Sequence, residues 1–301
     1  MHLTTSLHPL LTDRAISLLK QFSVTTVVQL LSMKPEKLCS ILSLPFSTVT
    51  QLRMDIFRDH GTFPKIGLEV YQASLEEEVQ VKTGSAVLDE MVGGLQGGMV
   101  YEVFGCPGSG KTELCMTAAV ETAGEGGRVM YLDSKDDFDP ARLAQIVSRR
   151  GRDVEDMALV MVTKVHTYKE LLHAVTKVVE EWQDIKLMVV DNITCLIMHL
   201  MEENRMFRTG FAIGCKVNHL LHKVASMLGA VVMVVSNMKG GEMSYLPALG
   251  GIWGGLADVR LFMDQVTESK RVVRVVRGRG TGAECKVIIN ELGLQDCDLT
   301  N

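Results

Sequence analysis

The first 64 residues carry the hydrophobic spacing of short helices. Apolar side chains return every three or four positions there, which predicts about four helices. Their expected ranges are 13–22, 25–31, 35–42 and 47–58. Thr12 is placed to cap the first helix, and Pro35 suits the first turn of the third. A bundle of this length has a thin core, so we expect a small all-helical N-terminal domain that depends on a neighbour for stability.

Residues 65–82 show no clear period and are predicted to form a linker. The acidic run Glu76-Glu77-Glu78 is interpreted as a solvated face of this linker. Tyr71 has two interpretations: part of a solvated linker, or an anchor that docks on a neighbouring subunit by adding a strand to its sheet. The sequence leaves that choice open.

From residue 83 onwards, short apolar runs alternate with helical stretches. Strands are expected at 100–104, 129–133, 159–162, 187–191 and 231–236. Helices are expected at 112–123, 139–149, 168–182 and 210–228. Strands that are apolar throughout are typical of sheets covered on both faces, so this order predicts an α/β fold with a mostly parallel sheet flanked by helices. The runs 259–263, 271–276 and 286–289 have no helix between them, which predicts an antiparallel extension of the sheet.

Composition narrows the class of protein. Among the 301 residues, 47% are hydrophobic and 22% are charged, which excludes wholesale disorder. The formal net charge of −5 excludes a polycation that coats nucleic acid, although a local basic groove remains compatible with it. Seven cysteines without a Cys-x-x-Cys pair suit a reducing compartment. Because no apolar run reaches the length of a bilayer span, we expect no membrane partner.

The glycines gather in one place, and the second half of the cluster spells a phosphate-binding motif. Eight consecutive residues match G-x-x-x-x-G-K-[ST], and they are Gly105, Cys106, Pro107, Gly108, Ser109, Gly110, Lys111 and Thr112. A strand precedes them and a helix follows, so a turn that matches by chance is the weaker interpretation. In such a cradle the backbone N–H groups and the helix N-terminus bind phosphate. The motif predicts ATP binding, with Lys111 on the terminal phosphates and the Thr112 hydroxyl on Mg²⁺.

A carboxylate for the metal is expected on another strand. Asp191 ends the apolar run 185–191, and a carboxylate at the tip of a buried strand beside the cradle can orient the water shell of Mg²⁺. The pairing of this aspartate with the cradle is more specific than either feature alone.

Hydrolysis needs one more carboxylate, to orient the attacking water. We expect it just beyond the tip of the strand next to the cradle, which we take to be 129–133. Two positions past Asp133 stands Lys135, which cannot act as a base while protonated. Asp136 and Asp137 are possible substitute bases, but a displacement of about 1 Å can cost about 100-fold in rate. The sequence therefore predicts nucleotide binding and assigns no catalytic residue outright.

The order of these parts resembles the RecA-type recombinases of eukaryotes over essentially the whole chain. The stretch 247–253 is similar to one found in the recombinase paralogues. Three features are similar to the paralogue of D type: the stretch 26–30, the stretch from 70–71 through 81–84, and the absence of a glutamate at Lys135. The resemblance implies a RecA-like P-loop ATPase core at 83–301, a linker at 65–82 and the helical domain at 1–64. It also implies a nuclear subunit of a multi-paralogue complex that binds single-stranded DNA and assists the main recombinase at double-strand breaks and stalled forks.

The same resemblance implies surfaces for partners and DNA. The N-terminal domain and linker would contact the smallest paralogue, and the core would contact the C-type paralogue. The two loops expected to face DNA, 201–210 and 238–250, contain the basic residues Arg205, Arg208 and Lys239. A basic hairpin follows, in which Arg271 is expected to be exposed, while Arg277 and Arg279 are candidates for a nucleotide at a subunit interface.

Two departures from the recombinases limit the inferred activity. Lys135 stands where they place a catalytic glutamate, and Met238 stands where the strand-exchange enzyme has a glutamine that senses the terminal phosphate. Two alternatives to an assembly subunit stay open, an autonomous DNA-dependent ATPase or strand-exchange enzyme and a P-loop kinase for small molecules. The kinase would need an arginine-rich lid and an acceptor pocket, and neither is evident in the sequence.

Overall fold

A computed structural model gives the fold and divides the chain into two compact units, 1–73 and 74–301. The structure describes residues 2–60, 66–68, 71–72, 79–182, 184–203, 207–238 and 257–297. Each unit is described by itself below. Part of the predicted linker 65–82 lies outside the described residues, so the expected domain bounds stay a prediction.

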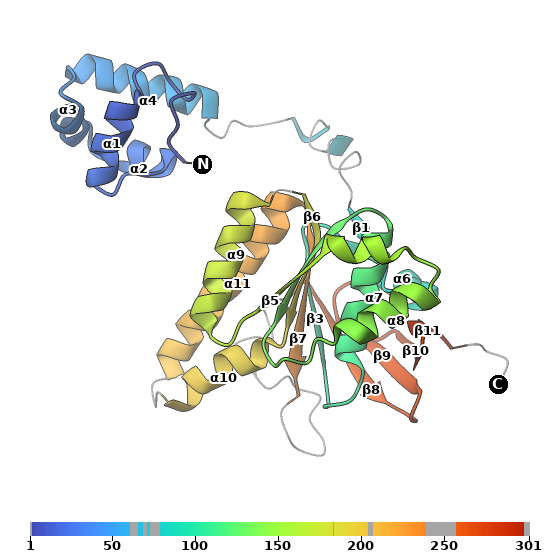
Figure 1. Ribbon diagram of the computed structural model, residues 1–301. Coiled ribbons are helices and arrows are strands. Elements are labelled where there is room, and N and C mark those ends of the chain that lie inside the picture. The colour runs from blue at the N-terminus through green and yellow to red at the C-terminus, as the bar shows by residue number, and fades with distance from the viewer. Residues whose placement is uncertain are drawn as a thin grey trace. The chain divides into compact units, whose positions relative to one another are not determined.

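The N-terminal unit is a small bundle of helices (Figure 1). Its helices are α1 (Asp13–Gln21), α2 (Val27–Ser32), α3 (Pro35–Leu42) and α4 (Phe46–His60). Thr12 caps α1, and Thr26 with Gln29 forms a capping box at the start of α2. The leucines at the helical spacing meet in one core, in which Leu19, Leu30 and Leu52 are fully buried.

The second unit is built on a nine-stranded sheet with the order β11-β10-β9-β8-β3-β7-β6-β4-β5. Its first strands in chain order are β3 (Val100–Gly105), β4 (Arg128–Asp133), β5 (Val160–Lys164), β6 (Ile185–Asp191) and β7 (Val231–Asn237). The remaining strands are β8 (Val259–Gln265), β9 (Lys270–Arg277), β10 (Glu284–Asn290) and β11 (Gly293–Asp296). All pairings from β8 through β3, β7, β6 and β4 to β5 are parallel, which confirms the predicted α/β fold.

Helices cover both faces of the sheet (Figure 1). One face packs against α7 (Lys111–Gly124) and α8 (Pro140–Arg149). The other packs against α9 (Tyr168–Glu181), α10 (Ile193–Glu203) and α11 (Phe207–Leu228). Leu187 and Val189 point into the first core and Met188 and Val190 into the second, as the alternation along a strand requires. Burial on both faces explains why these strands are apolar throughout.

Several elements were not expected from the sequence. These are α6 (Ala86–Val92), the two-stranded ribbon β1 (Gln80–Val81) and β2 (Leu95–Gln96), the 3-10 helix Val154–Leu159, α10 and β11. Helix α10 begins almost directly after β6, because the Asn192 side chain accepts from the Thr194 N–H at 2.8 Å and caps its first turn. Its isoleucines and leucines continue the apolar run of the strand, so hydrophobicity alone shows no boundary there.

Two expectations about the sheet are wrong in part. Strand β8 was expected to be antiparallel, but it lies parallel to β3 and only its other neighbour, β9, is antiparallel. Strand β4 was taken to be next to the cradle strand, yet β7 and β6 lie between them. The carboxyl ends of β3, β7, β6, β4 and β8 therefore share one edge of the sheet, where ligands bind in open α/β folds.

Among the residues that the structure describes, no helix is long and apolar enough to cross a bilayer.

Candidate nucleotide site

The phosphate-binding motif lies between β3 and α7, at the carboxyl edge of the sheet. Gly110 adopts φ of 98°, a left-handed conformation that favours glycine, and a Cβ there would collide with Ile289. A Cβ on Gly105 would collide with the Met263 carbonyl oxygen of β8. The motif borders a cavity of about 420 Å³ that also contacts the ends of β4, β6, β7 and β9. The glycines are thus required by close packing around the loop as well as by its backbone path.

The Lys111 side chain lies against the phosphate-binding loop. Its side chain is 7% exposed, and its Nζ donates to the carbonyl oxygens of Gly105 at 3.0 Å and Cys106 at 2.7 Å. A third bond goes to Ser109 Oγ at 3.3 Å. Burial lowers the pKa of this amine, and the nearby Asp191 carboxylate opposes that shift. The loop thereby holds a buried cation where phosphate oxygens would lie.

Asp191 lies beside the phosphate-binding loop, at the position that the sequence predicts. The Thr112 hydroxyl donates to Asp191 Oδ2 at 2.7 Å, and the Tyr131 hydroxyl donates to the same oxygen at 3.0 Å. Burial raises the pKa of Asp191, while the hydrogen bonds from Thr112 and Tyr131 oppose the rise. The contact from Tyr131, on β4, was not expected from the sequence. A tyrosine within an apolar strand gives no sign that its hydroxyl bonds to a site residue.

The residues present fit Mg²⁺. Thr112 and Asp191 offer a hydroxyl and a carboxylate, the oxygen ligands that this ion prefers. Within the described part of the chain no group of three or more His, Cys, Asp or Glu side chains could hold a metal. Magnesium commonly takes one or two protein oxygens and completes its shell with water and substrate phosphates, so a sparse set beside a phosphate cradle is what it needs. There it would neutralise phosphate charge.

A polar network links β6 and β7 beside the cavity. Asn192 Nδ2 donates to Asn237 Oδ1 at 2.8 Å, and the Asn237 N–H donates to Thr194 Oγ1 at 2.9 Å. Ser134 Oγ bonds to both the N–H and the carbonyl oxygen of Asn192, at 2.8 and 2.7 Å. Sequence reasoning missed Asn192 and its partners. The sequence signal that could have identified this network is the asparagine directly after Asp191, at the end of the strand.

The structure separates the two substitute bases. Asp136 is exposed, and its ion pair with Lys164 at 2.5 Å lowers its pKa. It does not line the cavity, whereas Asp137 and Lys135 do. The buried Asp133 carboxylate accepts from the backbone N–H of Lys135 at 3.1 Å and so fixes the turn that presents these side chains.

Arg271 is a correction to the sequence analysis. It was expected on an exposed hairpin, but it is only 7% exposed and lines the nucleotide cavity with Lys111. Strand β8 ends at the cradle edge and β9 starts there, with Gln265 paired to Arg271. The first residues of β9 are thus carried to the cradle by the chain reversal, which the sequence pattern did not reveal.

The remaining predicted contacts are not brought to the cradle. Arg277 pairs with Arg260 at the start of β8, which lies at the opposite edge of the sheet, and Arg279 packs against Gly93 there. They cannot reach this chain's own cradle, and contact with a neighbour's nucleotide stays a prediction. Tyr71 is 59% exposed. Arg205, Lys239 and the side chain of Arg208 lie outside the described part of the structure.

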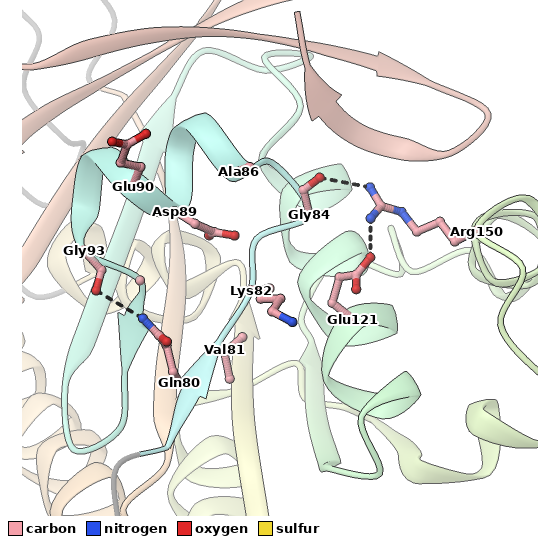
Figure 2. A pocket seen from close by; sticks show the side chains of 11 residues that line it. Gln80, Val81, Lys82, Gly84, Ala86, Asp89, Glu90, Gly93, Glu121 and Arg150 are labelled. Carbon is pink, nitrogen blue, oxygen red and sulfur yellow. Dashed lines mark hydrogen bonds and ion pairs between the residues drawn. The ribbon is translucent and has the colours of Figure 1, made fainter. Parts of the chain in front are cut away.

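A second hollow, of about 540 Å³, lies near the other end of α7 (Figure 2). Arg150 crosses it, paired with Glu121 and donating to the Gly84 carbonyl oxygen at 3.3 Å and that of Leu294 at 2.5 Å. Glu121 also accepts from Arg152 at 2.7 Å. None of the hollow's described side chains has a buried polar atom without a partner. These charges tie β11 to α7, which is a structural role.

Comparison with known proteins agrees with this architecture. The Rad51 family model matches residues 75–297. The chain is 28% identical over 285 residues to "DNA repair protein RAD51 homolog 4" of Bos taurus, covering 89% of this chain and 86% of that protein. The protein of the same name from Mus musculus is 26% identical over 319 residues, covering 98% and 96%. "DNA repair protein RAD51 homolog A" of Zea mays is 31% identical over 238 residues, covering 70% and 64%.

These similarities confirm the expected resemblance to a RecA-type recombinase paralogue. With the family match spanning the whole sheet and its phosphate motif, the chain belongs to the Rad51 family.

Proposed function

We propose that the chain is an ATP-binding subunit of a multi-paralogue complex, and that it acts in the nucleus in homologous-recombination repair of double-strand breaks and stalled forks. In this role it binds single-stranded DNA and assists the main recombinase. The observation that carries the proposal is the meeting of Lys111, Thr112 and Asp191 at one cavity of a Rad51-family fold. The relatives named as RAD51 homolog 4 support the repair role.

The cradle supports ATP with Mg²⁺ as the bound species. Residues 105–112 bind the phosphates through backbone N–H groups, and Lys111 exchanges its loop carbonyls for phosphate oxygens. Thr112 holds the ion, and Asp191 orients the water around it. Tyr131 fixes the Asp191 carboxylate toward Thr112.

Hydrolysis in the isolated subunit is expected to be slow. Lys135 lines the cavity in the place where a carboxylate would orient water, and Asp136 is committed to Lys164. Asp137 is the one carboxylate of that turn that lines the cavity, so it is the substitute base that the geometry favours. Turnover by a neighbouring subunit's residue would suit an assembly in which nucleotide stabilises an interface.

Lys135→Glu is expected to raise ATP turnover of the isolated chain at least about tenfold, because a positioned carboxylate contributes about 10²- to 10⁴-fold in general. The backbone of position 135 is already held by Asp133, so the new side chain starts from a fixed turn. Phosphate release with and without single-stranded DNA measures the effect.

Lys135→Ala is the matched control, since it removes the lysine without adding a carboxylate. A similar gain in both variants would show that the lysine obstructs the site, and no gain in either would contradict the missing-base account. Asp137→Asn tests the autonomous-enzyme alternative. That alternative is favoured if the unaltered chain turns over near 1 s⁻¹, a typical enzyme rate, and loses this activity in Asp137→Asn.

Two exposed apolar grooves support the assembly role. In the N-terminal unit, α2 and α4 border a groove of about 810 Å³ with Val28, Phe46 and Met54 more than half exposed. Its polar atoms Thr50 Oγ1 and Arg53 Nε are covered but have no hydrogen-bond partner among the described residues. We assign this groove to the smallest paralogue.

The core offers the second groove, of about 550 Å³, between α9 and the outer strand β5. Its lining includes the apolar side chains of Met161, Ala174 and Trp182 and the lysines Lys169 and Lys177. Strand β5 pairs only with β4 among the described strands, so its outer edge is able to accept an added strand. We assign this groove to the C-type paralogue.

Full-length variants test these assignments. Met54→Glu is expected to release the smallest paralogue from the purified complex and to retain the C-type paralogue, and Ala174→Glu is expected to do the reverse. The stoichiometry of co-purified subunits measures both results. An exchange of the two outcomes would show that the surfaces are reversed, and a chain that purifies alone in every case would contradict the assembly role.

The DNA contacts rest on the family resemblance, with Arg205, Arg208 and Lys239 as the proposed phosphate-binding residues. Binding of the assembled complex to labelled single-stranded DNA, compared with an Arg205→Ala, Arg208→Ala, Lys239→Ala triple variant, tests them. A small-molecule kinase is the weaker alternative, because no described feature supplies its arginine-rich lid.

A further inference from the structure

One side chain of the cavity has no role in the function proposed above. Arg271 lies on β9, is 7% exposed and borders the same space as Lys111 and Thr112. Its Nε lies 3.6 Å from the point where a Cβ on Gly110 would stand. Because Gly110 immediately precedes α7, the guanidinium sits against the loop that would hold phosphate.

One nitrogen of the Arg271 guanidinium is bonded within the turn, and its buried Nε is not. Its Nη1 donates to the carbonyl oxygens of Thr267, Glu268 and Lys270 at 2.8, 3.0 and 3.1 Å, which anchors the side chain to the β8–β9 turn. Nε is buried and has no hydrogen-bond partner among the described residues. Buried polar groups are almost always paired, so an unpaired buried N–H invites an explanation.

Two of the three carboxylates that line the cavity, those of Glu113 and Asp191, are bonded to other residues, and the third belongs to Asp137. Glu113 is held by Arg142, whose Nη2 donates to it at 2.8 Å. Asp191 accepts from Thr112 and Tyr131. No ion pair joins Arg271 to a carboxylate in the described part of the chain, and arginine stays protonated in proteins. The guanidinium therefore has no carboxylate partner among the described residues.

We propose that Arg271 is a further nucleotide-positioning residue, which contacts a phosphate of the bound nucleotide in the same chain through the Nε–Nη2 edge of its guanidinium. The inference rests on the proposed ATP-binding function and deepens it. A guanidinium presents two parallel N–H donors that match the oxygens of a phosphate. With Nη1 pinned to the turn, that edge is held ready and little side-chain freedom is lost when phosphate arrives.

Lysine cannot replace this arrangement, because an ammonium group is a point charge without the planar fork. Arg271→Lys is therefore expected to weaken binding of Mg-ATP by the full-length chain by about 10- to 100-fold, the range for a lost charge-assisted contact. Arg274→Lys is the matched control. Arg274 lies on the same strand, pairs with Glu284 at 2.6 Å and does not line the cavity, so its replacement is expected to change affinity less than about twofold.

Inorganic tripolyphosphate separates a phosphate contact from a contact to base or ribose. Calorimetric titration of the unaltered chain, Arg271→Lys and Arg274→Lys with Mg-ATP and with tripolyphosphate gives the comparison. An equal penalty for both ligands in Arg271→Lys supports the inference. A penalty for ATP alone, or none at all, overturns it while leaving the proposed function intact.

Thermal melting of the ligand-free proteins guards against a purely structural effect. Arg271→Lys is expected to melt within a few degrees of the unaltered chain, since an ammonium can still donate to the turn carbonyls. If it melts much lower, Arg271→Gln, whose amide can donate to the same carbonyls without charge, is titrated instead. A neutral variant with unchanged melting and unchanged tripolyphosphate affinity overturns the inference, and failure of the unaltered chain to bind either ligand overturns the proposed function as well.

Discussion

Glu102→Gln is expected to lower the free energy of unfolding of the core by about 3–5 kcal/mol, the usual cost of removing one charge of a buried ion pair. Glu102 lies on β3 and is fully buried, and its Oε2 accepts from Arg260 Nε at 2.6 Å. Its other oxygen accepts from Ser236 Oγ at 2.5 Å. The guanidinium of Arg260 also lies over the Phe104 ring, 5.1 Å from its centroid. Urea denaturation followed by circular dichroism measures the loss.

Two comparisons make this result specific. Glu284→Gln breaks the half-exposed pair with Arg274 on the same sheet, and exposed pairs contribute about 0–1 kcal/mol. The double replacement Glu102→Met, Arg260→Met removes both charges and is expected to recover much of the stability, since apolar substitutes for a buried pair are often neutral. A loss below about 1 kcal/mol in Glu102→Gln would contradict a stabilising pair.

This pair also bears on the site. Ser236 is bonded to Glu102, and the next residue, Asn237, closes the polar network beside the cavity. The buried charges thus fix the end of β7 relative to β3, the strand that leads into the phosphate-binding loop. A shift there would reach the nucleotide cavity through Asn237 and Asn192.

The helices and strands with strong periodicity could be predicted from the sequence. The pattern over 13–22 gave α1, and the apolar run before Gly105 gave β3. Elements without a clear period were missed. Helix α10 continues the apolar run of β6, and β1 and β2 are two residues each, too short for any alternation to register.

The parts of the site that are local in sequence could be predicted, and the parts that depend on long-range contacts could not. The cradle is consecutive in sequence, and Asp191 ends a recognisable strand. Arg271 reaches the same cavity from 160 residues beyond Lys111, through a chain reversal and through the parallel placement of β8, which no local pattern encodes. The order of strands also decided which neighbours the cradle has, and that order depends on tertiary packing rather than on any single run of residues.

Lys111→Met is expected to weaken Mg-ATP binding by at least about 100-fold, because two charge-assisted contacts to phosphate oxygens are lost at about 1.5–3 kcal/mol each. The replacement has similar length and keeps the buried stem of the side chain. Isothermal titration of the full-length chain measures the affinity. Lys82→Met is the matched control, since Lys82 is an exposed lysine that pairs with Glu125 at 2.6 Å outside the cavity, and it is expected to bind ATP within about twofold.

Thermal melting of the ligand-free protein distinguishes a loss of ATP affinity from unfolding. Burial lowers the pKa of Lys111, which means that the charged amine is less favourable in the folded loop than in water. Removing that charge therefore offsets much of the cost of its three lost loop bonds, and the ligand-free Lys111→Met chain is expected to melt close to the unaltered one. A variant that melts normally and still binds Mg-ATP within about threefold would contradict the cradle, because no other buried ammonium reaches this cavity in the described part of the chain.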